Sequence, residues 1–322
     1  MTEAVDPVDP PLLAVREAVS RAIAEDVLPL GDLTAMLVPS DAVLDAWLVA
    51  REGGVLAGRL CAIEAFAQVD PGIAVDWLLR DASVLRPGER IAEVHGPARS
   101  VLTAERTALN FLCHLSGVAT LARRYVEAVV AAGRTTRVLD TRKTTPGLRA
   151  LEKAAVRAGG AFNHRGSLSE AVLVKDNHLG GVGIAEAVAR ARERWPGRLV
   201  EVECDRAEQV VQSIEAGAGA VLLDNMGPDE VRECVRVAAS EARYGKVLVE
   251  VSGGVSLDLA PAYAEAGADL ISVGAITHSA PALDIGLDLV GDAGERAATL
   301  RGQGGPRAGA PIRARIAKRE VP

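Results

Sequence analysis

The sequence has few aromatic residues, few cysteines and no long apolar run, and each shortage excludes a class of protein. Aromatic residues make up 3% of the 322, so alanine, valine and leucine must fill the core. No uncharged apolar stretch reaches the roughly 18 residues needed to cross a bilayer. The first eleven residues lack the cationic and apolar regions of a signal peptide. We therefore expect a soluble, cytoplasmic protein.

The cysteines are too few and too scattered for a disulfide framework. The four are Cys61, Cys113, Cys204 and Cys234, and no two of them form a CxxC pair. This distribution is typical of a reduced cytosolic enzyme rather than a secreted domain held by disulfides. We expect buried thiols at these positions.

Positive charge is also in short supply. Lysine and arginine total 36 against 43 aspartate and glutamate, which gives a net charge of -7. A protein whose main role is to coat nucleic acid or an anionic membrane is basic, so we expect neither partner. The hydrophobic fraction of 49% and charged fraction of 25% are those of a globular protein. Any site for an anionic ligand must be local.

The chain changes its pattern near residue 120, which predicts two domains, over residues 1–117 and 118–300. Residues 12–28 and 98–116 have apolar side chains at helical spacing, and Gly117 is expected to end the second helix. Short β-like runs between about 43 and 95 predict a small mixed α/β domain. Residues 301–322 carry six basic side chains against one acidic and are expected to form a flexible basic tail.

Beyond residue 120, apolar strands alternate with alanine-rich helices. Strands are predicted at 137–140, 171–175, 199–203, 220–224, 247–252 and 270–274. Near-continuous apolar strands that alternate with helices indicate a parallel sheet buried on both faces. The pattern favours a βα barrel with fewer than eight strands. A doubly wound sheet is disfavoured because no GxGxxG fingerprint follows the first strand.

Charged residues follow these apolar strands one after another. In βα barrels the active site lies at the carboxyl ends of the strands. The charged residues at these ends are Arg142, Lys143, Lys175, Glu203 and Asp224, and a second cluster, His164 and Arg165, lies in the loop before the Lys175 strand. The basic members of this set predict a pocket for a multiply anionic ligand, because arginine forks suit carboxylate and phosphate oxygens.

Glycines follow the last two predicted strands. They are Gly253 and Gly254, after Ser252, and Gly274, four residues before His278. Backbone N–H groups of such turns bind phosphate where a helix begins. We expect a phosphate site here, and His278 either donates to the phosphate or caps the helix.

Two carboxylates, Glu203 and Asp224, end neighbouring predicted strands. Oxygen ligands of this kind suit Mg²⁺, which commonly bridges substrate phosphates, so we expect a magnesium site. The alternative is that the pair only neutralises neighbouring cations. Zinc is not expected, because the histidines and cysteines lack the spacing of zinc ligands.

Several motifs together resemble one enzyme family. They are RTALNFLCHLSGVAT (106–120), DTRKTTPGLRALEKAAVRAGG (140–160), NHRGSLSEAVLVKDNHL (163–179), VEVEC (200–204), LLDNM (222–226), VEVSGGV (249–255) and VGAITHSAPALDIGLDL (273–289). Over about residues 12–290 the chain resembles the quinolinate phosphoribosyltransferase family. The resemblance implies an N-terminal α/β sandwich domain and an incomplete, seven-stranded α/β barrel, with the last segment packing back on the first domain.

The resemblance also implies an activity, a cofactor and an assembly. Family members are Mg²⁺-dependent pentosyltransferases of NAD biosynthesis. They join quinolinate to 5-phosphoribosyl 1-pyrophosphate, release pyrophosphate and CO₂, and form nicotinate mononucleotide. They act as homodimers in which a helix of one subunit completes the site of the other.

The family pattern implies roles for individual residues. The quinolinate-binding set is Arg106 (from the second subunit), Arg142, His164, Arg165 and Lys175. The catalytic set is Lys143, Glu203 and Asp224, with Glu203 and Asp224 near the metal. The phosphate-binding set is Ser252, Gly253, Gly254, Gly274 and His278. Either Lys143 or a water returns a proton to C2 after decarboxylation.

Three alternatives stay open. A relative in the same fold could phosphoribosylate another acid without loss of CO₂, although the paired cations favour a dicarboxylate. A Schiff-base aldolase could use Lys175 or Lys143 at a strand end. A non-catalytic barrel would bind ligand without turnover.

Overall fold

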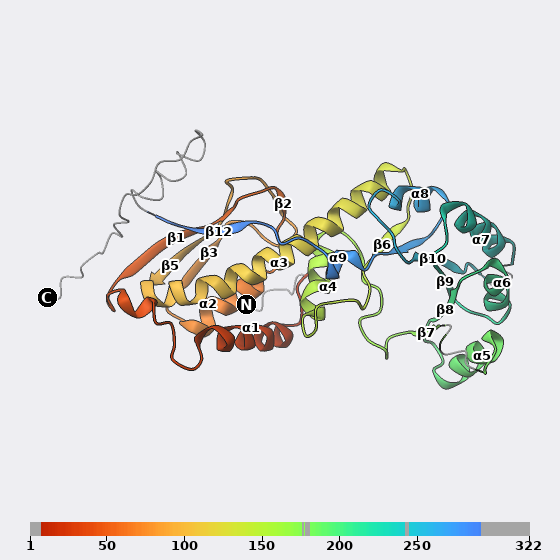
Figure 1. The fold of residues 1–322 in the computed structure, drawn as a ribbon, viewed down its shortest axis with the longest axis horizontal. Helices are drawn as coiled ribbons and strands as arrows, with labels where there is room; N and C mark the ends of the chain where they lie inside the picture. The colour runs from red at the N-terminus through yellow and green to blue at the C-terminus, as the bar shows by residue number, and fades with distance from the viewer. Residues whose placement is uncertain (1–7, 176, 178–180, 242–244, 291–322) are drawn as a thin grey trace. The chain divides into compact units, whose positions relative to one another are not determined.

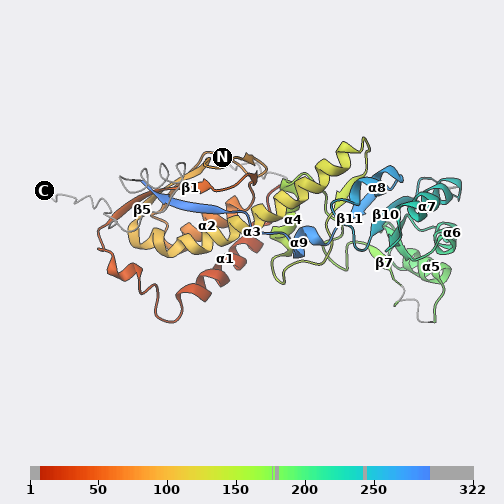
Figure 2. The same ribbon diagram turned by 45° about the horizontal axis from the view of Figure 1, so that its top comes forward.

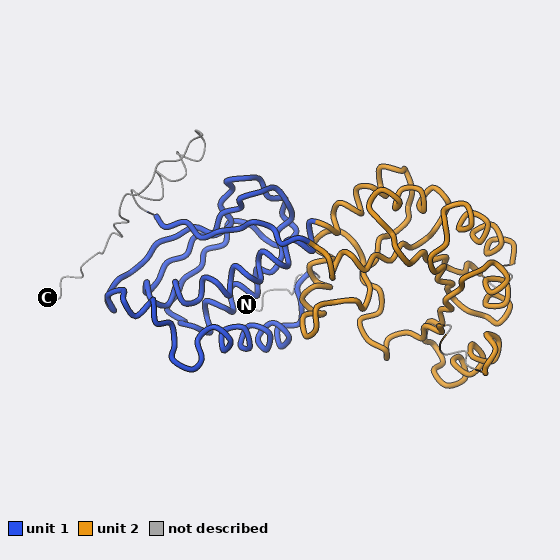
Figure 3. Tube along the Cα trace, in the orientation of Figure 1, with its two compact units in different colours: residues 1–120, 281–322 blue, residues 121–280 orange. Residues whose placement is uncertain are grey.

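The computed structural model describes residues 8–175, 177, 181–241 and 245–290. The chain divides into two compact units, residues 1–120 with 281–322 and residues 121–280 (Figure 3). No helix in the described part of the chain is long and apolar enough to cross a membrane. The predicted basic tail, 301–322, lies outside the described residues.

The first unit is built on an antiparallel sheet with helices against one face (Figures 1 and 2). The strand order is β12 (Ile285–Leu289), β1 (Val43–Ala50), β5 (Arg90–Pro97) and β3 (Ala74–Trp77). Its helices are α1 (Leu12–Val27), α2 (Arg59–Val69) and the first part of α3 (Ala98–Ala131), with a short 3-10 turn at Ala35–Leu37. β2 (Gly54–Val55) and β4 (Val84–Leu85) form a separate pair.

Alternation along the strands shows why only one face of this sheet is covered. In β5, Ala92 and Val94 are buried, whereas Glu93 and His95 are exposed. His95 lies opposite Asp45 of β1, and its Nδ1 is 2.7 Å from the Asp45 carboxylate. An antiparallel sheet with one polar face has this period of two. The first predicted helix and the mixed α/β domain are confirmed.

The predicted end of the second helix at Gly117 is wrong, because α3 continues through Gly117 to Ala131. A Cβ at Gly117 would lie 2.0 Å from the carbonyl oxygen of Pro281. The glycine therefore permits close packing against the returning chain rather than a helix end. That returning chain forms β12, which Asp288 ties to Arg51 through two hydrogen bonds of 2.6 and 2.8 Å.

The second unit is a parallel sheet alternating with helices, as predicted. The strands are β6 (Arg137–Leu139), β7 (Val172–Val174), β8 (Val200–Cys204), β9 (Ala220–Asp224), β10 (Leu248–Ser252) and β11 (Leu270–Ser272). The helices are α4 (Arg149–Ala158), α5 (Ile184–Arg194), α6 (Ala207–Glu215), α7 (Pro228–Glu241), α8 (Ala260–Glu265) and α9 (Ala275–His278). All six predicted strands are present.

The strand order identifies this sheet as an incomplete barrel. The order is β6-β11-β10-β9-β8-β7, so the first strand of the unit pairs with its last. Phe162 forms a parallel bridge to Leu139 on the other side of β6. The seventh strand is thus reduced to one bridge, and no pairing joins it to β7 among the described residues. The fold class is confirmed, and the doubly wound alternative is wrong.

The thiols are free, as expected. Cys61, Cys204 and Cys234 are buried, and Cys113 is partly exposed.

Candidate active site

A cavity of about 190 Å³ lies at the carboxyl ends of the parallel strands. Eight residues singled out from the sequence line it: Arg142, Lys143, His164, Arg165, Lys175, Glu203, Asp224 and Ser252. Thr141, Leu173, Leu222, Glu250 and Ser272 complete the lining. A larger hollow of about 880 Å³ between β7 and α5 is mainly apolar and shares only Arg165 and Leu173 with this cavity. The chemistry therefore gathers in the smaller cavity.

Two arginines, Arg142 and Arg165, line the cation side of the cavity. The Nε of Arg142 is buried and has no hydrogen-bond partner within the described residues. Burial and the charge of Arg142 lower the pKa of the Arg165 guanidinium. Two partly desolvated like charges are costly unless an anion neutralises them, so this part of the cavity is prepared for an anionic ligand.

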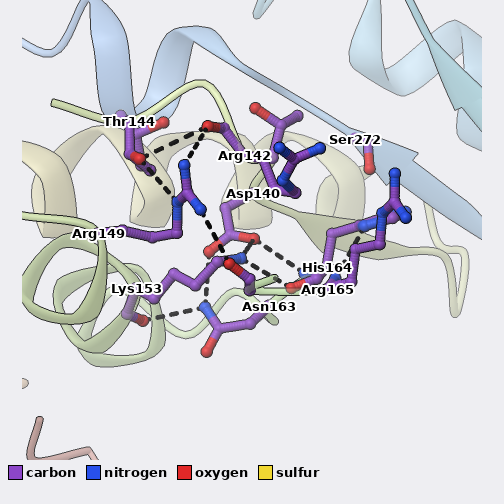
Figure 4. A network of polar contacts seen from close by, with 12 residues as sticks. Asp140, Arg142, Thr144, Arg149, Lys153, Asn163, His164, Arg165 and Ser272 are labelled. Carbon is purple, nitrogen blue, oxygen red and sulfur yellow. Dashed lines mark hydrogen bonds and ion pairs between the residues drawn. The ribbon is translucent and has the colours of Figure 1, made fainter. Parts of the chain in front are cut away.

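The backbone of His164 is held by a buried ion pair below the cavity (Figure 4). The Asp140 carboxylate accepts hydrogen bonds from Lys153 Nζ (2.5 Å) and from the His164 amide (2.8 Å). Lys153 also donates to the His164 carbonyl at 2.7 Å. Burial raises the pKa of Asp140 and lowers that of Lys153, and their mutual attraction opposes both effects. Asn163 adds a 2.7 Å bond to Asp140.

The imidazole of His164 is fixed at both nitrogens. The Arg165 amide donates to Nδ1 at 2.8 Å, so the proton of the neutral ring belongs on Nε2. Nε2 lies 3.2 Å from Glu201 and 3.4 Å from Glu250. Burial lowers the pKa of His164, but the two carboxylates outweigh that effect and raise it.

Glu250 has a pKa well above that of an ordinary glutamate. Burial and the charge of Glu201 raise the pKa of the Glu250 carboxyl to about 8. Its Oε1 accepts a 2.5 Å hydrogen bond from Ser272. Although His164, Glu201 and Glu250 could together supply metal ligands, a metal needs the Nε2 lone pair. Since that nitrogen carries the proton, the cluster does not fit a metal ion.

The carboxylates predicted as metal ligands lie on neighbouring strands. Glu203 of β8 forms an ion pair with Lys175. Asp224 ends β9 opposite Ser252 of β10, and one of its oxygens accepts a 2.7 Å hydrogen bond from Asn225. Both carboxylates line the cavity, and each uses one of its oxygens in these contacts.

Two of the predicted phosphate-binding glycines, Gly253 and Gly274, have restricted surroundings. Gly253 has φ +90°, and a Cβ there would lie 2.3 Å from Asn225 Oδ1, so only glycine fits. A Cβ at Gly274 would lie 3.1 Å from His278 Nε2 and 3.2 Å from Lys143 Cδ. Gly274, His278 and Lys143 are thus brought together, although the glycines and His278 do not line the cavity itself.

The backbone of Lys143 is anchored on two sides. Its amide donates to Thr141 Oγ1 at 3.0 Å, and its carbonyl accepts from Thr277 Oγ1 at 2.8 Å. His278 lies at the last position of α9, and its Nδ1 is 2.7 Å from Ser279 Oγ. No side chain caps the start of α9, so His278 has no N-capping role.

Arg106 belongs to the other unit. It lies on α3, and its side chain is exposed although the adjacent Thr107 and Ala108 are buried.

Sequence analysis missed the inner acidic residues. Glu201 and Glu250 each precede a predicted site residue, Glu203 or Ser252, by two positions. Residues two apart on a strand share a face, so this spacing could have revealed them.

Two comparisons with known sequences decide the family. Family models of quinolinate phosphoribosyl transferase match residues 32–116 with the N-terminal domain and residues 118–288 with the C-terminal domain. The chain belongs to this family. A similar curated relative is the carboxylating nicotinate-nucleotide pyrophosphorylase of Mycobacterium leprae, 42% identical over 281 residues, or 86% of this chain and 97% of the relative. The Homo sapiens enzyme of the same name is 44% identical over 257 residues, or 79% and 85%.

Solved structures of the family have the same fold. The nicotinate-nucleotide pyrophosphorylase from Francisella tularensis superposes with a TM-score of 0.83 and 40% identity, covering 89% of this chain and all of that one. The family resemblance and the α/β fold class inferred from the sequence are therefore confirmed.

Proposed function

We propose that the protein transfers the phosphoribosyl group of 5-phosphoribosyl 1-pyrophosphate to quinolinate, with decarboxylation, in NAD biosynthesis. The observation that carries this proposal is the cluster of cationic groups in one small cavity of an acidic chain. Arg142, His164, Arg165 and Lys175 all line it. Because quinolinate carries two carboxylates, it can satisfy both arginine forks, which a monocarboxylate would leave partly unpaired.

The donor would bind on the side of the cavity where β10 and β11 end. Ser252 ends β10, Gly253 and Gly254 follow it, and Gly274 lies beside Lys143 and His278. Such turns bind phosphate through backbone N–H groups that glycine leaves accessible. Lys143 would then lie between the dicarboxylate and the donor.

Magnesium fits the acidic side of the cavity. Glu203 and Asp224 supply the hard oxygen donors that Mg²⁺ prefers, and they would hold it directly or through water. When bound, the ion would neutralise charge on the departing pyrophosphate.

The chain's own residues would mainly orient quinolinate and stabilise the charge that develops during the reaction. The arginines place quinolinate so that its ring nitrogen bonds to ribose C1 while the bond from C1 to the pyrophosphate oxygen breaks. Charge then developing at C1 is stabilised by Glu203 and Asp224. The 2-carboxylate leaves as CO₂, its bonding electrons stay on C2, and a proton from Lys143 or water restores the C–H bond.

The assembly and location are part of the proposal. A homodimer would bring the exposed Arg106 of a second subunit to quinolinate. A cytoplasmic location is supported by the free thiols in the described chain.

The test uses purified protein with Mg²⁺, the phosphoribosyl donor and carboxyl-labelled quinolinate. We expect labelled CO₂ and nicotinate mononucleotide in equal amounts, both dependent on the donor. Phosphoribosylation of another acid without CO₂ would contradict the proposed substrate. A borohydride-trapped adduct with Lys143 or Lys175 would favour an aldolase instead.

A further inference from the structure

Two separate loops supply the arginines of the cavity. Arg142 lies in the loop after β6, and Arg165 lies in the loop before β7, with α4 between them in sequence. Asp140 joins the bases of these loops through its hydrogen bonds to Asn163 and to the His164 amide. These bonds hold the residues that precede the two arginines in the chain. They do not by themselves fix the distance between the guanidinium groups of Arg142 and Arg165.

Arg149, the first residue of α4, joins the same loops at a second point (Figure 4). Its Nη2 donates to the Arg142 carbonyl at 3.2 Å, and its Nη1 donates to the Gly166 carbonyl at 3.0 Å. Its Nε donates to Thr144 Oγ1 at 3.0 Å. All three nitrogens of one planar group are therefore used, and two of them join residue 142 to the neighbour of residue 165.

The cavity arginines need such a support because they repel each other. The charge of Arg142 lowers the pKa of Arg165, and the buried Nε of Arg142 has no partner in the described structure. Without ligand, the loops would relax if they were free to move apart. A rigid fork between their carbonyls opposes that relaxation and preserves the geometry that a dicarboxylate requires.

The charge of Arg149 is itself not neutralised by its hydrogen-bond partners. They are two carbonyls and one hydroxyl. Its positive charge therefore adds to the potential of the cavity without occupying it, since Arg149 is not among the lining residues. Lys153 is close enough for the Arg149 charge to oppose its protonation.

We propose that Arg149 is a positioning residue for the dicarboxylate. Through its hydrogen bonds to the two loop carbonyls it sets the separation of Arg142 and Arg165. The inference rests on the proposed function, because quinolinate is the ligand that needs this separation. The inference predicts that substitution of Arg149 weakens the binding of quinolinate alone, since the phosphate-binding turns after β10 and β11 receive no hydrogen bond from Arg149.

The test is Arg149→Lys in the full chain, which keeps the charge but cannot form the three-pronged contact. Isothermal titration with quinolinate alone should show affinity reduced about tenfold, the usual scale for lost charge-assisted bonds. The KM for the phosphoribosyl donor should stay within about twofold, because no Arg149 bond reaches its elements. Arg232→Lys, on an exposed face of α7, is the matched control and should leave both values unchanged.

The outcomes separate this inference from the proposed function. If unaltered protein turns over quinolinate and Arg149→Lys binds it equally well, Arg149 has no positioning role. Equal weakening of quinolinate and donor, with a lower melting temperature, would show a merely structural role and also overturn the inference. No turnover by unaltered protein would instead contradict the proposed function.

A second variant covers the case in which Arg149→Lys does not fold. Thr144→Val removes the acceptor of the Arg149 Nε and the 3.5 Å hydrogen bond from Thr144 Oγ1 to the Arg142 carbonyl, but it leaves both bonds from Arg149 to carbonyls. It should weaken quinolinate binding about twofold to threefold, with donor KM unchanged, because only the two hydrogen bonds of one neutral hydroxyl are lost. Unchanged quinolinate affinity in Thr144→Val would then overturn the inference.

Discussion

The first unit spreads its charged side chains over one face of an antiparallel sheet, whereas the second gathers them at one end of a parallel sheet. In β5, Glu93 and His95 alternate with buried residues. In β9, Ala220–Leu223 are all buried and the charge comes only at Asp224. A sheet covered on both faces has no open face for charge, so polar chemistry moves to the strand ends.

The inner acids of the second unit are the exception to this contrast. Glu201 and Glu250 lie inside the barrel and are almost fully buried. They are tolerated because His164 and Ser272 supply hydrogen-bond partners and the raised pKa of Glu250 favours its neutral form. Charge within a buried parallel sheet therefore occurs where it supports a site residue.

The strongest test of this contrast compares one aspartate from each sheet. Asp224→Ala should lower Mg²⁺-dependent turnover by at least about 100-fold, because it removes a carboxylate that we propose as a magnesium ligand at a strand end. Asp45→Ala, on the open face of the first unit, should retain the activity of the unaltered protein. Steady-state rates at several Mg²⁺ concentrations measure both. Near-normal turnover of Asp224→Ala would remove this residue from the proposed catalytic set.

A pair of arginines gives the next test. Arg142→Ala should weaken quinolinate binding by about 2–4 kcal/mol, with little change for the donor, since a buried charge-assisted contact is lost. Its counterpart is Arg90→Ala, whose guanidinium stacks on Trp47 at 3.2 Å in the first unit. That variant should bind quinolinate normally. Calorimetric titration with quinolinate and with the donor measures both affinities in each variant. An equal loss of affinity for both ligands in Arg142→Ala would contradict the division of roles between the arginines and the donor-binding residues.

The fold could be predicted from the sequence to the extent that its signals are local. The strands of the second unit were predictable because each is a short, mainly apolar run, such as Ala220–Leu223, between helical segments. The role of Gly117 was not, because the atom that excludes a side chain there belongs to Pro281, far along the chain. A local pattern shows a glycine but not the neighbour that requires it.

The residues of the site also divide into those with a local sequence signal and those that depend on distant neighbours. Strand-end residues such as Lys175 and Asp224 were predictable because strand order brings them to one edge. The network behind them was not, since Arg149 acts through backbone carbonyls that any residue type provides. Likewise Lys153 looks like an ordinary helix residue until Asp140 and His164 are placed beside it.

The inner acids predict a pH effect on stability. The Glu250 pKa is about 8 in the folded protein against an ordinary 4.5, so the folded state binds more protons between these values. The free energy of unfolding should therefore fall as pH rises from about 4.5 to about 8, by on the order of a few kcal/mol from this group. Glu250→Gln should remove that part of the slope.

Urea unfolding between pH 5 and pH 9 measures this effect. Glu93→Gln, on the exposed face of the first unit, is the matched control and should keep the slope of the unaltered protein. Identical pH slopes for Glu250→Gln and the unaltered protein would mean that Glu250 is not the group that holds the proton.

The smallest effect concerns packing in the first unit. Gly117→Ala should destabilise the protein by about 1–3 kcal/mol, because the added methyl group overlaps the Pro281 carbonyl and forces α3 and the returning chain apart. Gly53→Ala is the control, since its nearest contact would be an ordinary 3.5 Å, and it should change stability by less than about 0.5 kcal/mol. Denaturant unfolding followed by circular dichroism compares the two. If the variants were equally stable, the glycine would not be required by the return of the chain, and its place within α3 would need another cause.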